Sequence, residues 1–318
     1  MKKVLVTGGS GFIGSNFIRH LINNTDYEVV NLDLLTYAGN PNNLKDIEKN
    51  KRYKFVQGDI VDTKTVEKAM LGCDLVFNFA AESHVDNSIK EAEPFIRTNI
   101  LGTKTVLDQA MEQGVDRVVH IGTDEVYGSV EKGSSKETSR LEPRNPYSAS
   151  KAGADLLALS YVNTYNFDVV ITRSSNNYGP YQYPEKMVPL FITNILERKK
   201  VPLYGDGKNI RDWLFVEDNC RGILTAGEKG RKGEIYNIGG GNEFSNMELT
   251  LKILHALGKD SGFIMQVADR PGHDKRYSLD SSKIKKLGWK PQKNFKQGLK
   301  ETIEWYKKNE NWWKPLKK

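Results

Sequence analysis

The residues most able to carry chemistry in this sequence form two short runs near its middle. In one run, Tyr147 and Lys151 stand four positions apart, which places both side chains on one face of a helix. An ammonium group beside a phenol favours the phenolate, so we expect Lys151 to lower the pKa of Tyr147 from its usual value of about 10. A tyrosine tuned in this way can take a proton from a hydroxyl group near neutral pH.

The other run is Thr123, Asp124 and Glu125, which directly follow a predicted strand. Ligands of parallel α/β sheets bind at the carboxyl ends of the strands, so these side chains are well placed for a site. Neighbouring Asp and Glu residues can serve as acid and base when their surroundings push their pKa values apart. The alternative is a solvated loop, where both residue types are common.

A glycine-rich turn near the start of the sequence predicts a phosphate site. Gly8, Gly11 and Gly14 follow the predicted strand Lys3–Thr7 and open a helix. In that setting the glycines permit a tight turn, a close approach of the pyrophosphate and close packing of helix on strand. The N-terminus of the helix then offers its N–H groups to the phosphates.

Asp33, at the end of the second predicted strand, indicates which dinucleotide binds. A carboxylate there binds the ribose hydroxyls of NAD and repels the 2′-phosphate of NADP. We therefore expect NAD as the cofactor. The alternative is a surface aspartate with no ligand.

These groups must be positioned by a larger α/β framework. Short apolar runs alternate with helical patterns through residues 1–175, and most runs lack the polar alternation of half-exposed strands. The predicted strands are Lys3–Thr7, Glu28–Leu32, Tyr53–Gln57, Leu75–Asn78, Arg117–Gly122 and Asp168–Arg173. This order predicts an α/β protein with a Rossmann-type doubly wound parallel sheet.

From residue 176 the pattern changes. Residues 176–189 are rich in Asn, Tyr, Gly and Pro, which is typical of a loop. Helical patterns then recur at Val188–Arg198, Asn246–Leu257, Ser281–Leu287 and Phe295–Lys308. We expect an NAD-binding domain over residues 1–175 and a smaller C-terminal α/β substrate-binding lobe over residues 176–318, with some exchange of chain between them.

The composition disfavours several function classes. The net charge of +7 resides in residues 285–318, where eleven lysines face three glutamates, a pattern more typical of a solvated helix than of a nucleic-acid arm. No apolar run approaches the ~20 residues of a membrane span, and no signal peptide is recognisable. Cys73 and Cys220 match no metal spacing. We expect a cytoplasmic protein with no nucleic-acid, membrane or metal partner; DNA binding by the lysine-rich tail stays an alternative.

Longer motifs resemble the extended short-chain dehydrogenase/reductase superfamily, and within it the dTDP-glucose 4,6-dehydratase family. The likeness extends from about residue 3 to about residue 308. The motifs that carry it are Leu34–Asn40, Ala80–Asp86, Thr123–Gly128, Asn176–Gln182, Arg211–Asp218 and Arg270–Asp274.

This resemblance implies a reaction in which dTDP-glucose becomes dTDP-4-keto-6-deoxyglucose and water. Tyr147, with Lys151 and Thr123, would take the proton of the C4 hydroxyl while C4 gives hydride to NAD. Glu125 would remove the C5 proton, Asp124 would protonate the C6 hydroxyl as water leaves, and hydride would return to C6. Because NAD is regenerated in each turnover, we expect it to be held tightly. We also expect perturbed pKa values at Asp124, Glu125 and Tyr147.

Asp124 distinguishes this reaction from its rivals. By the same resemblance, nucleotide-sugar epimerases, decarboxylases and GDP-mannose dehydratases generally have Ser or another small residue at this position. The alternatives are a UDP-glucose 4,6-dehydratase and a UDP-sugar 4-epimerase or decarboxylase. An NAD-binding regulator without activity would lose Tyr147 or Lys151, and both are present.

The resemblance also implies two sets of binding residues. The NAD set is Gly8, Gly11, Phe12, Ile13, Gly14, Asp33, Leu34, Leu35, Thr36, Asp59, Ile60, Ala80, Ala81, Ser83, Thr98, Tyr147, Lys151 and Asn177. The nucleotide-sugar set is Ser83, Thr123, Asn176, Lys186, Met187, Pro202, Leu203, Tyr204, Arg211, Asn246, Arg270 and His273. Met187 and Leu203 depart from the family pattern near the base, which leaves thymidine or uridine open.

Two helical segments flank the predicted site and carry apolar residues over more than one face. They are Pro94–Gln113 and Ser148–Tyr165. A helix that is apolar over a wide arc must bury its second face. Together with the family resemblance, this predicts a homodimer through a four-helix bundle; the alternative is that the C-terminal lobe covers these faces.

Overall fold

The centre of the molecule is a seven-stranded parallel sheet. The computed structural model describes residues 1–269 and 272–317. The strand order is β10-β6-β5-β4-β1-β2-β3. The strands are β1 (Lys3–Thr7), β2 (Glu28–Asp33), β3 (Tyr53–Gln57), β4 (Leu75–Asn78), β5 (Arg117–Thr123), β6 (Val169–Ser174) and β10 (Ile235–Ile238). The predicted fold class is confirmed.

Helices cover both faces of this sheet, and each face has its own apolar core. On β1, Val4 and Val6 pack toward α1 (Phe12–Asn24) and α8 (Val216–Lys229), whereas Leu5 packs toward the opposite layer. Residues alternate in this way because neighbouring side chains of a strand point to opposite faces. The opposite layer contains α2 (Thr63–Met70), α5 (Thr103–Glu112) and α6 (Pro146–Tyr165).

The six strands predicted in the first part are confirmed to within a residue at each end. Two elements of the central layers were not predicted. Strand β10 pairs with β6, and helix α8 packs on β5 and β6, although both follow residue 176 in the sequence. The chain therefore returns from the second lobe to complete the first one.

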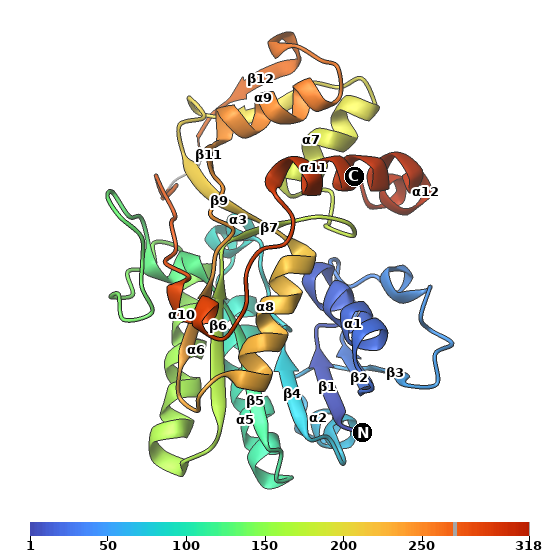
Figure 1. The fold of residues 1–318 in the computed structure, drawn as a ribbon, viewed down its shortest axis with the longest axis vertical. Coiled ribbons are helices and arrows are strands. Elements are labelled where there is room, and N and C mark those ends of the chain that lie inside the picture. Colours follow the sequence, from blue (N-terminus) through green and yellow to red (C-terminus); the bar gives the residue numbers. More distant parts are fainter. Residues whose placement is uncertain (270–271, 318) are drawn as a thin grey trace.

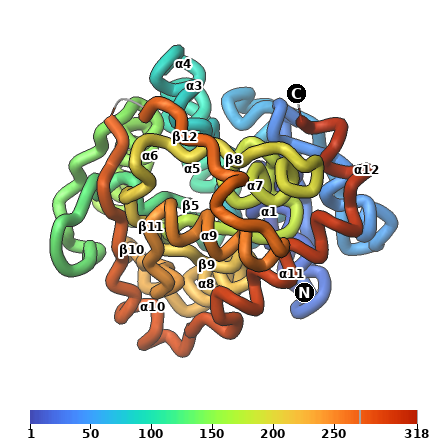
Figure 2. The backbone as a smooth tube through the Cα atoms, turned by 90° about the horizontal axis from the view of Figure 1, so that it is seen from above, coloured from blue at the N-terminus to red at the C-terminus, as the bar shows by residue number. Residues whose placement is uncertain are grey.

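The second lobe lies above the carboxyl ends of the central strands (Figure 1). It contains a three-stranded sheet of order β11-β9-β7 and a β12-β8 pair. Its strands are β7 (Asn176–Tyr178), β8 (Val201–Tyr204), β9 (Ile210–Phe215), β11 (Glu243–Ser245) and β12 (Ile264–Val267). Seen from above, β8, α7 (Met187–Leu196) and α9 (Asn246–Ala256) overlie the sheet (Figure 2).

The helices predicted after residue 176 are confirmed as α7, α9, α10 (Ser282–Lys286) and α11 (Phe295–Lys308), but α10 packs on α8 and β10 of the first lobe. The purely loop-like prediction for residues 176–189 is wrong at its start, where β7 pairs with β9. That pairing joins segments far apart in sequence, which local composition does not reveal. The remaining helices are η1 (Pro41–Leu44), α3 (Val85–Lys90), α4 (Glu93–Phe95), η2 (Ile96–Gly102), η3 (Asp124–Tyr127), η4 (Ser261–Phe263), α12 (Glu310–Trp313) and η5 (Lys314–Leu316).

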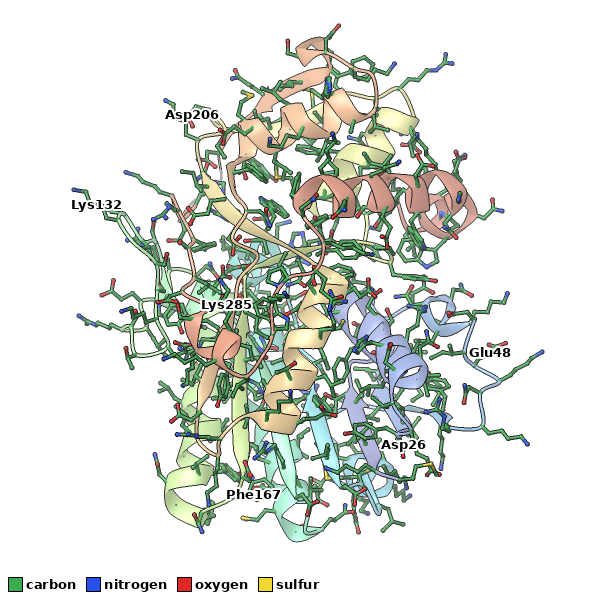
Figure 3. All side chains as sticks on the ribbon, in the orientation of Figure 1. Asp26, Glu48, Lys132, Phe167, Asp206 and Lys285 are labelled. Atoms are coloured by element: carbon green, nitrogen blue, oxygen red, sulfur yellow. The ribbon has the colours of Figure 1, made fainter. Side chains whose placement is uncertain are left out.

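The lysine-rich C-terminal segment is a solvated, locally paired surface. Lys293 forms ion pairs with Glu217 and Glu301, and Lys314 forms one with Glu310. Lys285 on α10 is exposed (labelled in Figure 3). Such pairs contribute about 0–1 kcal/mol each and spread the positive charge among carboxylates.

Three expectations from composition concern the described part of the chain. Cys73 and Cys220 are buried as free thiols, as expected of small core residues. No described helix is both long and apolar enough to cross a membrane. Within residues 1–269 and 272–317, no group of three or more His, Cys, Asp or Glu side chains is arranged to hold a metal.

Candidate active site

A cavity of about 360 Å³ lies at the carboxyl ends of the central strands. It is lined by residues that follow β1, β2, β3, β4, β5 and β6, and by the segment from Ser174 to Lys186 that leads into the second lobe. The strands are parallel, so the loops at their carboxyl ends gather at one edge. The five predicted catalytic residues, Thr123, Asp124, Glu125, Tyr147 and Lys151, all line this cavity.

The glycine turn has the close contacts that a phosphate cradle needs. A Cβ on Gly14 would lie 2.3 Å from the carbonyl oxygen of Gly8, and a Cβ on Gly8 would lie 2.7 Å from the backbone of Ala80. Gly8 also has a φ of +66°, which favours glycine. Helix α1 begins at Phe12, so its first N–H groups lack partners within the helix and point toward the cavity end of the turn.

Asp33 is held in a fixed orientation at the end of β2. Its carboxylate accepts hydrogen bonds of 2.8 Å from the backbone N–H groups of Ser10 and Leu35. Burial raises its pKa, while those two hydrogen bonds lower it. Each carboxylate oxygen has a second lone pair, so the group can still bind the hydroxyls of a ribose.

Most residues of the predicted NAD set line the same cavity. They are Gly8, Gly11, Phe12, Ile13, Gly14, Asp33, Leu34, Thr36, Asp59, Ile60, Ala80, Ala81, Ser83, Thr98, Tyr147, Lys151 and Asn177. Leu35 does not line it: its φ of +59° turns the chain, and its N–H group orients Asp33. The glycine cradle, the helix N-terminus and the carboxylate together fit a dinucleotide.

Asp124 and Glu125 stand at the cavity wall, where β5 gives way to the short helix η3. Thr123 caps this helix, because its hydroxyl accepts a 3.3 Å hydrogen bond from the N–H of Glu125. Asp124 is only 4% exposed. Burial first, and then the charge of Glu125, raise the pKa of Asp124 well above its usual range, whereas Arg211 acts in the opposite direction. The perturbation expected at Asp124 is therefore confirmed, and the group is suited to donate a proton.

Tyr147 and Lys151 lie one turn apart on α6, as predicted. Helix α6 begins at Pro146, and Asn145 caps it by accepting a 2.9 Å hydrogen bond from the N–H of Ser148. Lys151 Nζ donates a 2.6 Å hydrogen bond to the carbonyl oxygen of Ile121. Burial lowers the pKa of Lys151 to about 8.

The expected lowering of the pKa of Tyr147 is wrong for the protein alone. Burial raises this pKa, and the negative charges of Glu125 and Asp124 raise it further. A hydrogen bond with Thr123 opposes the rise. A role as base therefore requires positive charge close to the phenol, and Lys151 is a cation that lies one turn away.

Several polar oxygens at the cavity wall are buried without a hydrogen-bond partner among the described residues. They include Asp124 Oδ2, Asn176 Oδ1 and Asn177 Oδ1. Such atoms are costly to bury unless a bound group supplies the missing hydrogen bonds. Their position indicates that the cavity holds a polar ligand.

The predicted nucleotide-sugar set is divided between the cavity and the second lobe. Ser83, Thr123, Asn176 and Lys186 line the cavity, and Arg211 lies close enough to act on the charge of Asp124. The other described members of the predicted nucleotide-sugar set do not line the cavity; they are Met187, Pro202, Leu203, Tyr204, Arg211, Asn246 and His273. Leu203 is 1% exposed, so its side chain belongs to the core of this lobe. Arg270 lies outside the described residues.

Some cavity residues were not predicted from the sequence. They include Glu82, Ser175, Gln182, Tyr183 and Glu185. Two signals in the sequence could have indicated part of this group. Glu82 and Gln182 lie within the motifs that carried the family resemblance, and Ser175 directly follows β6, where ligands of a parallel sheet bind.

Two loops that line the cavity contact each other through Tyr37. The hydroxyl of Tyr37, in the loop after β2, donates a 3.3 Å hydrogen bond to Glu185, in the segment before α7. The rings of Tyr37 and Tyr183 also pack edge to face, with centroids 5.5 Å apart. These contacts connect the cofactor side of the cavity to the second lobe.

Comparison with known proteins places this geometry among nucleotide-sugar enzymes. The family model described as GDP-mannose 4,6 dehydratase matches residues 5–302. A dTDP-glucose 4,6-dehydratase of Streptomyces niveus is 50% identical, with 99% of this chain and 96% of that protein covered.

Two solved structures are similar over their whole length. DesIV, a dTDP-glucose 4,6-dehydratase from Streptomyces venezuelae solved with NAD and TYD bound, is 53% identical with a TM-score of 0.97, covering 99% of this chain and all of that one. A dTDP-glucose 4,6-dehydratase from Bacillus anthracis in complex with NAD is 48% identical with a TM-score of 0.94, and each chain is covered completely.

Proposed function

This chain belongs to the dTDP-glucose 4,6-dehydratase family, and we propose that it converts dTDP-glucose into dTDP-4-keto-6-deoxyglucose and water. The observation that carries this proposal is the buried Asp124 beside Glu125, in one cavity with Tyr147 and Lys151. Loss of water from C6 requires an acid, and burial raises the pKa of Asp124, which favours the protonated form of this carboxyl group.

The cofactor is NAD, bound between the glycine turn and Asp33. The lack of space for a Cβ at Gly8 and Gly14, and the two backbone hydrogen bonds that fix Asp33, support this placement. NAD held there would supply the acceptor for the hydride that leaves C4 and the donor for its return to C6, where C5 regains the proton lost in the elimination. The carboxylate of Asp33 disfavours the 2′-phosphate of NADP by charge repulsion.

In the first step Tyr147 takes the proton of the C4 hydroxyl. Thr123 binds the phenol oxygen, and its hydrogen bond favours the ionised form. Lys151 contributes a positive charge one helical turn away, held by the carbonyl of Ile121. These groups stabilise the phenolate that burial alone disfavours.

In the second step Glu125 takes the proton from C5, which the new ketone at C4 makes acidic. Asp124 gives its proton to the C6 hydroxyl, and water leaves. The two carboxyl groups are sequence neighbours but play opposite roles, since one must begin ionised and the other protonated. Their mutual repulsion supports this division, because it favours a single negative charge on the pair.

Residues of the second lobe bind the nucleotide. Arg211 is 5% exposed and donates to the carbonyls of Ile210 and Asp274, so its guanidinium is fixed beside the cavity. We assign it to the diphosphate, together with Arg270, because guanidinium groups match phosphate oxygens. Tyr204, at the end of β8, is 40% exposed, so its side chain can contact the nucleobase of the substrate.

The test is mass spectrometry of the product after incubation with dTDP-glucose and, in parallel, UDP-glucose. We expect loss of one water from dTDP-glucose with no net consumption of NAD. Preference for UDP-glucose would identify a uridine enzyme. An unchanged mass with a new epimer would contradict the dehydratase and indicate a 4-epimerase instead.

We also infer a homodimer through the two helical segments that flank the site. Apolar side chains remain exposed there, including Ile96 at 54%, Leu101 at 45% and Leu156 at 57%. The segment of Ile96 and Leu101 packs on α6, which carries Leu156, so one surface can include both. Exposed apolar groups gathered on neighbouring helices are typical of a subunit interface.

Light scattering tests the dimer. The wild-type chain should have twice the monomer mass at micromolar concentration, and Leu156→Glu should shift the distribution toward monomer. Met265→Glu, at an apolar side chain that is 47% exposed on the second lobe, is the matched control and should not. A monomeric wild type would contradict the proposal. The cytoplasmic location expected from the sequence stays a prediction that cell fractionation can test.

A further inference from the structure

Behind Lys151 lies a buried cluster of charged groups to which the proposed mechanism gives no role. Asp155 is one helical turn further along α6 and is completely buried. Its carboxylate forms a 2.8 Å ion pair with Arg173 of β6, and a contact of 3.4 Å with the imidazole of His120 on β5. We call Asp155, Arg173 and His120 the Asp155 cluster.

Strand β5 connects the Asp155 cluster to Lys151 and Tyr147. Within four consecutive residues, His120 contacts Asp155, the carbonyl of Ile121 accepts from Lys151, and Thr123 bonds the phenol of Tyr147. Gly122 leaves the space between them: a Cβ there would lie 3.1 Å from the Asp155 carboxylate and 2.9 Å from the carbonyl oxygen of Thr172. A side chain at this position would push the carboxylate away from the strand.

We propose that Asp155 is a positioning residue for the reaction, whose clamped carboxylate keeps the buried Lys151 ammonium charged and in place beside Tyr147. This inference rests on the proposed function. A buried ammonium group is unstable unless a negative charge lies near it. Burial lowers the pKa of Lys151 to about 8, and the charge of Asp155 acts in the opposite direction.

Asp155 remains ionised although it is buried. Burial alone would raise its pKa, but the contact with His120 and the charges of Arg173 and Lys151 lower it. Burial also lowers the pKa of His120, which favours the neutral ring, so its 3.4 Å contact places no second positive charge against the carboxylate. Within the cluster, the carboxylate of Asp155 is therefore the negative charge that acts on Lys151, one helical turn away on α6.

The other charged groups around this pair are accounted for. Lys151 donates to the Ile121 carbonyl of β5, and Arg173 and His120 contact the Asp155 carboxylate. Glu125 and Asp124 of η3 raise the pKa of Tyr147, and the charge of Asp155 acts on the phenol in the same direction, so Asp155 can favour the phenolate only through Lys151. Removal of the Asp155 charge should therefore destabilise the ammonium form of Lys151, which is needed to stabilise the phenolate.

The test is direct titration of Lys151 in the NAD-loaded protein by NMR of ¹³C-labelled lysine, with Lys151→Met to assign the signal. In Asp155→Asn we expect the pKa of Lys151 to fall by about one unit or more. The alkaline limb of NADH formation with dTDP-glucose should move to lower pH by the same amount. An unchanged pKa of Lys151 would overturn the proposal.

Asp218→Asn is the matched control. Asp218 is also completely buried, pairs with Arg221 and accepts hydrogen bonds from the N–H groups of Gln292 and Lys293, but it lies on α8 and does not line the cavity. It should lose stability without any shift of the Lys151 titration. Equal shifts in both variants would reduce Asp155 to a structural role.

A second variant covers the case in which Asp155→Asn does not fold. That change leaves Arg173 buried without its partner, which is strongly destabilising. The double variant Asp155→Asn with Arg173→Gln removes both charges and should still show the lowered Lys151 titration. The NMR readout needs no substrate, so failure of the wild type to dehydrate dTDP-glucose would contradict the proposed function and leave this test standing.

Discussion

Asp124 and Glu125 are sequence neighbours whose carboxyl groups oppose each other's ionisation at the wall of one cavity. Burial is the first reason that the pKa of Asp124 is raised, and the charge of Glu125 is the second. The proposed reaction uses the raised pKa of Asp124, since elimination of water needs one protonated carboxyl group and one ionised carboxylate.

Asp124→Asn should stop the elimination and stabilise the fold. Without the acid we expect turnover to fall about 10²- to 10⁴-fold, while NADH accumulates from the first step.

A group whose pKa is raised by folding contributes stability below its unfolded pKa of about 4 and loses that contribution as pH rises through the folded value. The variant should therefore melt at a higher temperature than wild type at neutral pH. Asp26→Asn, at an exposed position, is the control and should do neither (Figure 3). Full turnover in Asp124→Asn would refute the acid assignment.

Glu125→Gln should separate the two steps in another way. The variant should still oxidise C4, but it should no longer exchange the C5 hydrogen with solvent. Because the neighbouring negative charge is removed, the pKa of Asp124 should also fall toward its usual range. Deuterium incorporation from heavy water, measured by mass spectrometry, reports the exchange. Exchange at the wild-type rate would show that another group is the base.

Tyr147→Phe should block the first hydride transfer. The lost proton acceptor should reduce NADH formation about 10²- to 10⁴-fold in a single turnover, with substrate binding largely kept. Tyr178→Phe is a matched control, because Tyr178 is 1% exposed and its hydroxyl donates only to the carbonyl of Phe295 in the second-lobe core. If both variants slowed hydride transfer equally, the loss would reflect packing rather than proton transfer.

Gly14→Ala should weaken NAD binding through the backbone. The new Cβ would lie 2.3 Å from the carbonyl of Gly8, so the turn or the start of α1 must shift. We expect at least a tenfold rise in the Kd of NAD, about 1.4 kcal/mol, measured by fluorescence titration. Gly262→Ala, whose Cβ meets only the flexible carboxylate of Asp260, should bind NAD normally. Normal NAD binding by Gly14→Ala would contradict the assignment of the glycine turn as the site of the NAD phosphates.

Tyr37→Phe should speed the release of NAD. Loss of one hydrogen bond to Glu185, between two loops that line the cavity, corresponds to about 0.5–1.5 kcal/mol, or roughly a 2- to 10-fold faster dissociation. Stopped-flow displacement with excess NADH measures the rate. Tyr27→Phe removes a similar hydrogen bond to Glu228 on the surface and should leave the rate unchanged. A rate equal to wild type in Tyr37→Phe would show that the two loops do not retain the cofactor.

The sequence was most informative where chemistry follows directly from local order. The strands β1 to β6, the glycine turn and the Tyr147–Lys151 spacing depend on periodicity and short motifs, and these survive in the structure. The pKa of Tyr147 could not be predicted in the same way. It depends on burial and on carboxylates that β5 brings to the phenol from another part of the sequence.

Long-range pairing accounts for the remaining differences. Strand β7 depends on β9, which follows it only after α7 and β8, and β10 depends on β6, which precedes it by the whole segment from β7 to α8. The Asp155 cluster was missed for the same reason. Asp155 reads as an ordinary polar residue of a helix until β5 and β6 place His120 and Arg173 against it.

The return of the chain to the first lobe constrains the design of chimeras. Strand β10 covers the edge of β6, with Ile235 beside Ile171 and Ile238 beside Ser174, and α8 covers the apolar face of β5 and β6. A fragment cut at residue 175 would expose a strand edge and a bare apolar surface, and both promote aggregation. A substrate lobe exchanged between relatives must therefore be grafted in separate pieces. Residues 216–238 stay in the recipient, and so does the α10 segment, whose Ile284 and Trp289 pack in the same core.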